Sequence, residues 1–192
     1  MSSSSNTKRD KIIESALTLF AERGYHGTNV PDIAKMANVG TGTIYRYFKN
    51  KETLVNAVYQ KFTKKLTETI LSDFPSIGST YEQYLHIMNR LISFAKENKK
   101  AFSFIETHNH ADYLDESSKL IINELEAFLC AFIKEGVSQS KIRSNLTGVV
   151  LIAIVYGAFV ALFKRIEAGA IQETPEIIEG FLESSWDAIK SS

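Results

Sequence analysis

Apolar residues recur at spacings of three and four along nearly the whole chain, the pattern of amphipathic helices rather than strands. The first such segment lies between Thr7 and Gly24, with an apolar face made of Ile12, Ile13, Ala16, Leu17 and Phe20. Thr7 and Asp10 resemble a capping box, and glycine commonly follows the last residue of a helix. The pattern predicts a helix from Thr7 to Gly24, preceded by a disordered serine-rich tail at residues 1–6.

A second, shorter helix is predicted to begin between Thr28 and Pro31, because threonine caps helices and proline fits a first turn. Its inner face is Ile33, Ala34 and Ala37. The small alanines would let another helix approach closely. Asn38 follows, and asparagine tolerates a left-handed backbone, which predicts a tight turn before the next helix.

The next stretch, TGTIYRYF at Thr41–Phe48, is too short to be a stable helix alone in water. On a helical wheel Ile44 and Phe48 share one side, and the opposite side carries Gly42, Thr43, Arg46 and Tyr47. We expect Ile44 and Phe48 to anchor this helix to the two preceding ones. Its polar face would then be presented to a partner.

Six further helices complete an all-α chain of about nine helices. A long one follows the expected cap Asn50, and the others are predicted at about 80–98, 100–110, 117–138, 145–168 and 175–190. We predict a helix-turn-helix domain at residues 1–50 and a larger helical domain at 51–192 that begins with the connecting helix. Two helices separated by a tight turn, the second with a polar outer face, are typical of DNA-binding proteins.

The net charge is zero, but its distribution is uneven. Residues 1–65 carry eight Lys and three Arg against five acidic residues, a net +6, and the remainder carries −6. A basic N-terminal segment, residues 1–65, called the head below, on an otherwise acidic chain favours a polyanionic partner. The alternative is that the charges are unevenly distributed by chance. The single cysteine, Cys130, and the absence of a signal peptide pattern suit a reducing, cytoplasmic location.

The run from Lys11 to Val58 resembles the N-terminal domain of the TetR family of bacterial transcriptional regulators. LFAERGYHGT, DIAKMANV and GTIYRYFKNKETL carry the resemblance, in order and at matching spacing. Two differences from the family pattern occur: Asn38 stands where glycine is usual, and Gly40-Thr41 where Ser-Lys is frequent. The missing lysine means that an operator sequence cannot be transferred from relatives.

The resemblance and the helical wheel together assign candidate DNA contacts. Phosphates are expected to bind Thr28, Tyr45, Tyr47 and Lys51, with Lys49 beside the start of the connecting helix adding charge. Base edges are expected to contact Thr41, Gly42, Thr43 and Arg46, the last of these on guanine. The alternative is that Tyr45 packs in the core and Arg46 is merely solvated.

The segment from Val149 to Phe163 is apolar on all sides but, at 15 residues, is short for the roughly 20 that span a bilayer. We expect a buried helix and no membrane role. In the TetR family the last two helices pair with their copies in a homodimer. The expected interface residues are Ala153, Gly157, Ala161, Ile178, Leu182, Ser185 and Ile189. The alternative is the deepest core helix of a monomer.

Family members hold a small, often hydrophobic effector between the helices of the larger domain. The residues expected to line such a pocket are Phe62, Met88, Ile92, Phe104, Glu106, His110, Phe128, Phe132 and Tyr156, although a plain core is the alternative. Glu106 and His110 share a helical face, but two ligands are too few for a metal site. We therefore expect no metal and no cofactor.

The sequence is thus interpreted as a homodimeric regulator, usually a repressor in this family, released from a pseudo-palindromic operator by a small molecule. The nearest alternative is a DNA-occupying protein of the same fold that does not respond to a small molecule. A helical enzyme using Glu106 and His110 is more distant, because no nucleophile, base and orienting group occur together. We expect no enzymatic activity.

Overall fold

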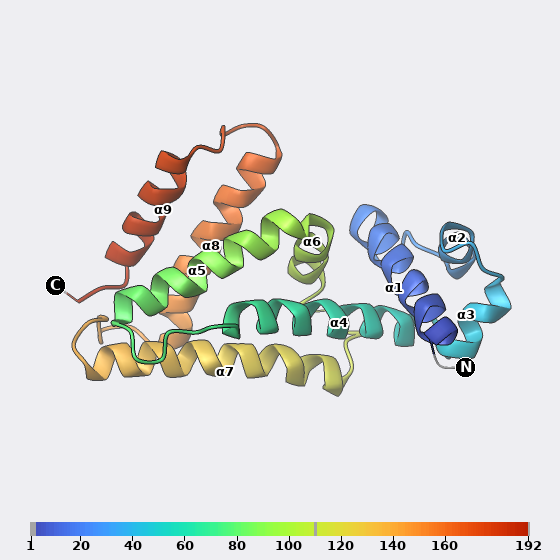
Figure 1. The fold of residues 1–192 in the computed structure, drawn as a ribbon, viewed down its shortest axis with the longest axis horizontal. Helices are drawn as coiled ribbons and strands as arrows, with labels where there is room; N and C mark the ends of the chain where they lie inside the picture. Colours follow the sequence, from blue (N-terminus) through green and yellow to red (C-terminus); the bar gives the residue numbers. More distant parts are fainter. Residues whose placement is uncertain (1–2, 110, 192) are drawn as a thin grey trace. The chain divides into compact units, whose positions relative to one another are not determined.

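The computed structural model of the protein describes residues 3–109 and 111–191, and these residues form nine α-helices and no β-strand (Figure 1). The helices are α1 (Ser3–Arg23), α2 (Val30–Met36), α3 (Thr41–Tyr47), α4 (Lys51–Leu71), α5 (Thr80–Glu97), α6 (Lys99–His108), α7 (Glu116–Ser138), α8 (Gly148–Glu167) and α9 (Pro175–Asp187). The prediction of an all-α chain is confirmed.

The start of α1 differs from the prediction. Residues 1–2 of the expected disordered tail lie outside the described residues, but α1 begins at Ser3 and runs through Thr7. The first four N–H groups of any helix lack an intrahelical partner, so serines are readily accommodated there. The Thr7–Asp10 pair therefore does not mark the start of the helix.

The chain divides into two compact units. Unit 1 contains Met1–Ile70 and Leu91–Asn123, and unit 2 contains Leu71–Arg90 and Glu124–Ser192. The first unit keeps α4 and α6 together with the first three helices, because α1 packs on both α2 and α6. The two compact units therefore differ from the predicted domains at residues 1–50 and 51–192. That predicted boundary separates DNA binding from the other functions of the chain, and it stays a prediction.

The core of unit 1 is centred on aromatic rings from three helices. Phe104 of α6 lies 6.1 Å from Phe20 of α1 and 6.4 Å from Tyr59 of α4, measured between ring centroids. All three side chains are buried. This packing fixes the position of α1, against which α2 packs, and α3 packs in turn on α2.

In unit 2, α8 and α9 form an antiparallel pair (Figure 1), with Phe159 of α8 6.4 Å from Phe181 of α9. The hydroxyl groups of Tyr84 on α5 and Ser185 on α9 are 2.6 Å apart, and Tyr84 also donates to the carbonyl of Leu182. Burial is the main cause that raises the pKa of Tyr84 to about 12. These contacts fix which face of α9 points inward.

The alternative in which α8 is the deepest core helix of a monomer is wrong, and the expected covering of its second side stays a prediction. Its inner face is buried, but its outer face includes Val149, Val150 and Ile154, which are 55%, 42% and 39% exposed. By length and composition alone α8 is apolar enough to cross a membrane, and only a minor part of it is buried inside the chain. The chain itself therefore covers only one side of this helix.

Candidate nucleic-acid interface

The first half of the helix-turn-helix is fixed by local capping and by packing. The Asn29 side chain accepts the backbone N–H of Asp32 at 2.9 Å, which caps α2, and Pro31 occupies the first turn. Ile33 and Ala34 are buried. As predicted, Asn38 has a left-handed backbone, with φ of 53°, and turns the chain into α3.

The short helix α3 is held by tertiary contacts. Ile44 is 1% exposed and Phe48, the residue that ends the helix, is 2% exposed. The predicted anchoring role of these two residues is confirmed. α3 packs against α2, so its orientation is set by the buried side rather than by its own stability.

The outer side of α3 faces solvent. Gly42, Tyr45 and Arg46 are exposed, and Thr41, Thr43 and Tyr47 are half-buried. Tyr45 is 53% exposed, so the alternative in which it packs in the core is wrong. A Cβ added to Gly42 would meet nothing within 4 Å, which leaves this position open to close approach by a partner.

Lys51 contacts the loop between α1 and α2. Its Nζ donates to the backbone carbonyls of Tyr25 at 2.9 Å and Thr28 at 3.0 Å, and lies 4.1 Å from the centre of the Tyr25 ring. An ammonium has three donors, and the two carbonyls use two of them within the chain. These contacts favour a role in which Lys51 holds the loop between α1 and α2, and the predicted contact with phosphate stays a prediction.

Thr28 is also used internally. Its hydroxyl contacts the carbonyls of Leu19 and Gly24 at 3.0 and 2.8 Å, and the residue is 2% exposed. A buried hydroxyl cannot reach a phosphate, so the predicted contact by this side chain is corrected. Thr28 follows Gly24, the residue after α1, by only four positions. That short spacing is the feature of the sequence that could have indicated a contact between Thr28 and the last carbonyls of α1.

Ion pairing in the head removes negative charge from this surface. The acidic residues between positions 8 and 49 are paired at N···O distances of 2.9 to 3.1 Å: Asp10 and Glu14 with Lys61, Glu22 with Lys100, and Asp32 with Arg23. The cations of the same segment without an ion pair among the described residues are Lys8, Arg9, Lys11, Lys35, Arg46 and Lys49. The head therefore presents unpaired positive charge.

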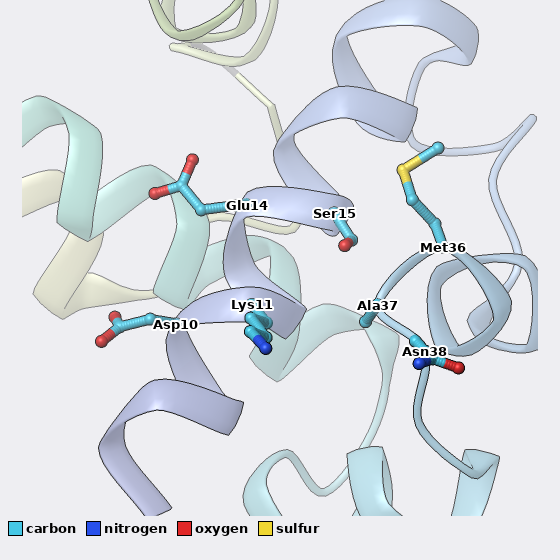
Figure 2. Close-up of a pocket in the computed structure, with 7 residues that line it drawn as sticks. All are labelled: Asp10, Lys11, Glu14, Ser15, Met36, Ala37 and Asn38. Atoms are coloured by element: carbon cyan, nitrogen blue, oxygen red, sulfur yellow. The ribbon is translucent and has the colours of Figure 1, made fainter. Parts of the chain in front are cut away.

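A groove of about 570 Å³ runs between α1 and the turn after α2. Figure 2 shows Lys11 and Ser15 of α1 on one side and Met36, Ala37 and Asn38 on the other. Asp10 and Glu14 at its edge already bind Lys61. Nothing in its lining forms a nucleophile and base pair.

The candidate pocket residues are divided between the two units. Phe62, Ile92, Phe104 and Glu106 belong to unit 1, whereas Met88, Phe128, Phe132 and Tyr156 belong to unit 2. Glu106, Phe128 and Tyr156 are half-buried and the other described members are buried. His110 lies outside the described residues. In the part of the chain that is described, no group of three metal-ligating side chains occurs.

Sequence reasoning missed a polar pair inside unit 1. Tyr59 Oη and Thr63 Oγ1, one turn apart on α4, are buried and have no hydrogen-bond partner among the described residues. Burial raises the pKa of Tyr59 to about 12, the nearby Thr63 hydroxyl lowers it, and the charge of Glu106 raises it. Buried hydroxyls are normally paired, so this pair stands out.

The candidate dimer residues fall into two groups. Ala153, Gly157 and Ala161 are exposed along α8, as an interface stripe requires, and Ile178 is half-buried. The chain itself, however, buries Leu182 and Ser185 of α9 and Ile189, which follows the end of α9. The predicted interface role of these three is corrected: their side chains are buried within the chain's own fold.

A helix-turn-helix with an open recognition helix and unpaired surrounding cations defines the class of DNA-binding regulators. The model of the family "Bacterial regulatory proteins, tetR family" matches residues 12–58, and that of the "Tetracyclin repressor-like, C-terminal domain" matches 59–191. The chain therefore belongs to the TetR family of helix-turn-helix transcriptional regulators.

Individual relatives agree with this assignment. The negative transcriptional regulator IcaR of the biofilm operon icaADBC from Staphylococcus aureus is 46% identical over 169 residues, 86% of this chain and 90% of that protein. A TetR-family regulator from Marinobacter aquaeolei has the same fold, with TM-score 0.90, 22% identity and full coverage of both chains. FadR from Bacillus subtilis, solved with stearoyl-CoA, matches with TM-score 0.73 and 20% identity over 92% of this chain and 95% of that one.

Proposed function

We propose that the protein is a homodimeric repressor that binds a pseudo-palindromic DNA operator and is released from it by a small, largely hydrophobic molecule. The observation that carries the proposal is the outer side of α3, where Gly42 leaves open space and Arg46 is exposed without an ion pair. Two such helices would enter successive major grooves about 34–36 Å apart.

Within α3, Arg46 is the residue proposed to read guanine, and Thr41, Gly42 and Thr43 are proposed to lie against base edges. Tyr45, Tyr47 and Lys49 are proposed to bind phosphates. Repression is supported by the similarity to a negative regulator from S. aureus. The chromosome is the partner, so the proposed location is the cytoplasm.

Dimer formation is supported by the outer face of α8. Val149, Val150 and Ile154 are exposed next to the small residues Ala153 and Gly157. A contiguous apolar face of this kind is unusual on a soluble monomer. A second copy would cover it in a two-fold arrangement, which would also supply the second recognition helix.

Effector binding is supported by an observation in unit 1 and by a protein of similar fold. The hydroxyls of Tyr59 and Thr63 are buried without partners, and a bound molecule with a hydrogen-bonding oxygen would satisfy them. FadR, of similar fold, was solved with a long-chain acyl-CoA.

The alternative is a DNA-occupying protein that does not respond to a small molecule. It differs in the distribution of its binding sites over the genome. It would bind many scattered sites rather than one palindrome. An effector works only through its differential affinity for two conformations of the protein. Operator affinity that is identical with and without every molecule that binds the protein would favour the alternative.

The testing experiment is selection of genomic fragments by the purified full-length protein at two salt concentrations, with Arg46→Ala in parallel. We expect one palindromic sequence to be enriched by the wild type. Arg46→Ala should relax selection at a guanine, with a loss of about 1–3 kcal/mol for that base pair. Lys64→Ala, on the exposed side of α4, is the charge-matched control. Absence of enrichment at both salt concentrations would refute the proposal.

A further inference from the structure

Arg9, near the start of α1, is placed against the end of the recognition helix. Its guanidinium carbon lies 5.4 Å from the centre of the Phe48 ring, and Phe48 is the residue that ends α3. Figure 1 shows the N-terminal part of α1, in dark blue, beside α3. Arg9 precedes residues 12–58, the part of the chain that matches the family model of the head.

No acidic side chain in the described part of the chain neutralises the charge of Arg9. The residue is exposed and has no ion pair with any described residue. Its neighbour Asp10 is engaged with Lys61 of α4 at 3.1 Å. Arg9 therefore adds a cation to the end of α3 that already carries Arg46 and Lys49.

Position along α3 indicates which part of DNA this cation meets. In a helix-turn-helix, the N-terminal residues of the recognition helix contact base edges in the major groove. The helix has seven residues and is about 10 Å long, while the groove is about 12 Å wide. Side chains beyond its C-terminal end therefore reach the phosphates that border the groove.

We propose that Arg9 is a DNA-positioning residue that binds a backbone phosphate beside the C-terminal end of α3. A guanidinium stacked on an aromatic ring is held in orientation, and its free N–H groups can donate two parallel hydrogen bonds to phosphate oxygens. The proposal rests on the proposed DNA binding and adds α1 to the interface. Contact with a phosphate carries no sequence information.

A purely structural role for Arg9 is the competing explanation. Stacking on Phe48 could serve only to fix the start of α1 against α3. Such a role would appear as a lower melting temperature without any change in the salt dependence of DNA binding. The salt dependence instead counts the phosphates that the protein neutralises.

The experiment uses the full-length protein and measures fluorescence anisotropy across a KCl series from about 50 to 200 mM. The probes are the duplex enriched by the wild type and a scrambled duplex of the same composition. The variants are Arg9→Gln, Arg9→Lys, and the control Lys64→Gln, which removes one exposed charge from α4. Thermal melts of each variant are recorded in parallel.

For Arg9→Gln we expect affinity to fall roughly tenfold on both duplexes, with the slope of log affinity against log salt reduced by about 1.8, or about 0.9 for each phosphate in a dimer. Arg9→Lys should retain the wild-type slope, because it retains the charge, and bind more weakly because it loses the planar fork. Lys64→Gln should resemble the wild type.

Two results would overturn this proposal while leaving DNA binding intact. One is an Arg9→Gln slope equal to that of Lys64→Gln. The other is a loss confined to the enriched duplex, which would make Arg9 a base-reading residue. Failure of the wild type to bind either duplex would overturn the proposed function together with this inference.

Discussion

The ammonium group of Lys51 lies 4.1 Å from the centre of the Tyr25 ring and donates hydrogen bonds to the carbonyls of Tyr25 and Thr28. Tyr25 in turn stacks on Tyr113 with ring centroids 4.1 Å apart. The first residue of α4 therefore fixes the loop that leads into α2. Lys51 thus stabilises the helix-turn-helix domain through contacts inside the chain.

We expect Lys51→Ala to lower the free energy of unfolding by about 1–2 kcal/mol, because two charge-assisted hydrogen bonds to backbone carbonyls are lost from a half-exposed site. Lys49→Ala, at an exposed neighbouring position, should change it by less than about 0.5 kcal/mol. Urea unfolding measures both. In DNA titrations only Lys49→Ala should reduce the salt slope; a reduced slope for a fully folded Lys51→Ala would contradict the assignment.

Gly42→Ala separates stability from recognition. Alanine should stabilise α3 by about 0.5–1 kcal/mol, since a Cβ at this position meets nothing in the protein. The same methyl group should weaken operator binding if DNA approaches this surface closely. Ser103→Ala, at an exposed position of α6, is the control that should leave binding unchanged. If Gly42→Ala bound the operator with wild-type affinity, DNA would not approach the surface of α3 at Gly42.

Tyr59→Phe should raise the free energy of unfolding of the effector-free protein by roughly 1 kcal/mol, because it removes a buried hydroxyl without a partner. Tyr84→Phe is the matched control. Its hydroxyl is bonded to Ser185 and Leu182, so this variant should be destabilised by about 1 kcal/mol. Chemical denaturation decides the matter, and equal destabilisation of both variants would show that Tyr59 is bonded in solution.

The stability of the protein at alkaline pH should depend on Tyr59 and Tyr84. Burial is the main cause that raises the pKa of Tyr59 and of Tyr84 to about 12, whereas the unfolded value is 10.0. Phenolate formation therefore favours the unfolded chain. Stability should be complete below pH 10 and fall between pH 10 and about 12, by roughly 2–3 kcal/mol for each tyrosine.

Denaturant melts across this pH range should show a shallower decline for Tyr59→Phe and Tyr84→Phe. Tyr45→Phe, at an exposed position, should follow the wild-type profile. A decline that is unchanged in both buried variants would mean that other groups cause it.

The corrected interface can be tested by charge insertion. Gly157→Glu places a carboxylate on the exposed stripe of α8, where a Cβ meets nothing in the monomer, and should convert the dimer to a folded monomer. Ala131→Glu, exposed on α7, should remain dimeric. Ser185→Ala should lower monomer stability instead, because Tyr84 loses one of its two hydrogen-bond partners. Sedimentation velocity distinguishes these outcomes, and a dimeric Gly157→Glu would contradict the proposal.

Features that depend on neighbours along the chain were predictable from the sequence. The left-handed turn at Asn38, the anchoring of α3 by Ile44 and Phe48, and the number of helices all follow from local conformational preferences and helical spacing. The resemblance of the run from Lys11 to Val58 then added the family and its candidate contacts.

Other features required the tertiary structure, because they depend on partners distant in sequence. The pattern shows that Lys51 and Thr28 are polar and near the head, but not that carbonyls of the α1–α2 loop and of the end of α1 lie within their reach. Periodicity likewise identifies one apolar face on α9 without saying what covers it. Tyr84, about a hundred residues away, decides that Ser185 points inward. A helical wheel gives the direction of a side chain relative to its own axis, whereas packing between helices decides what it meets.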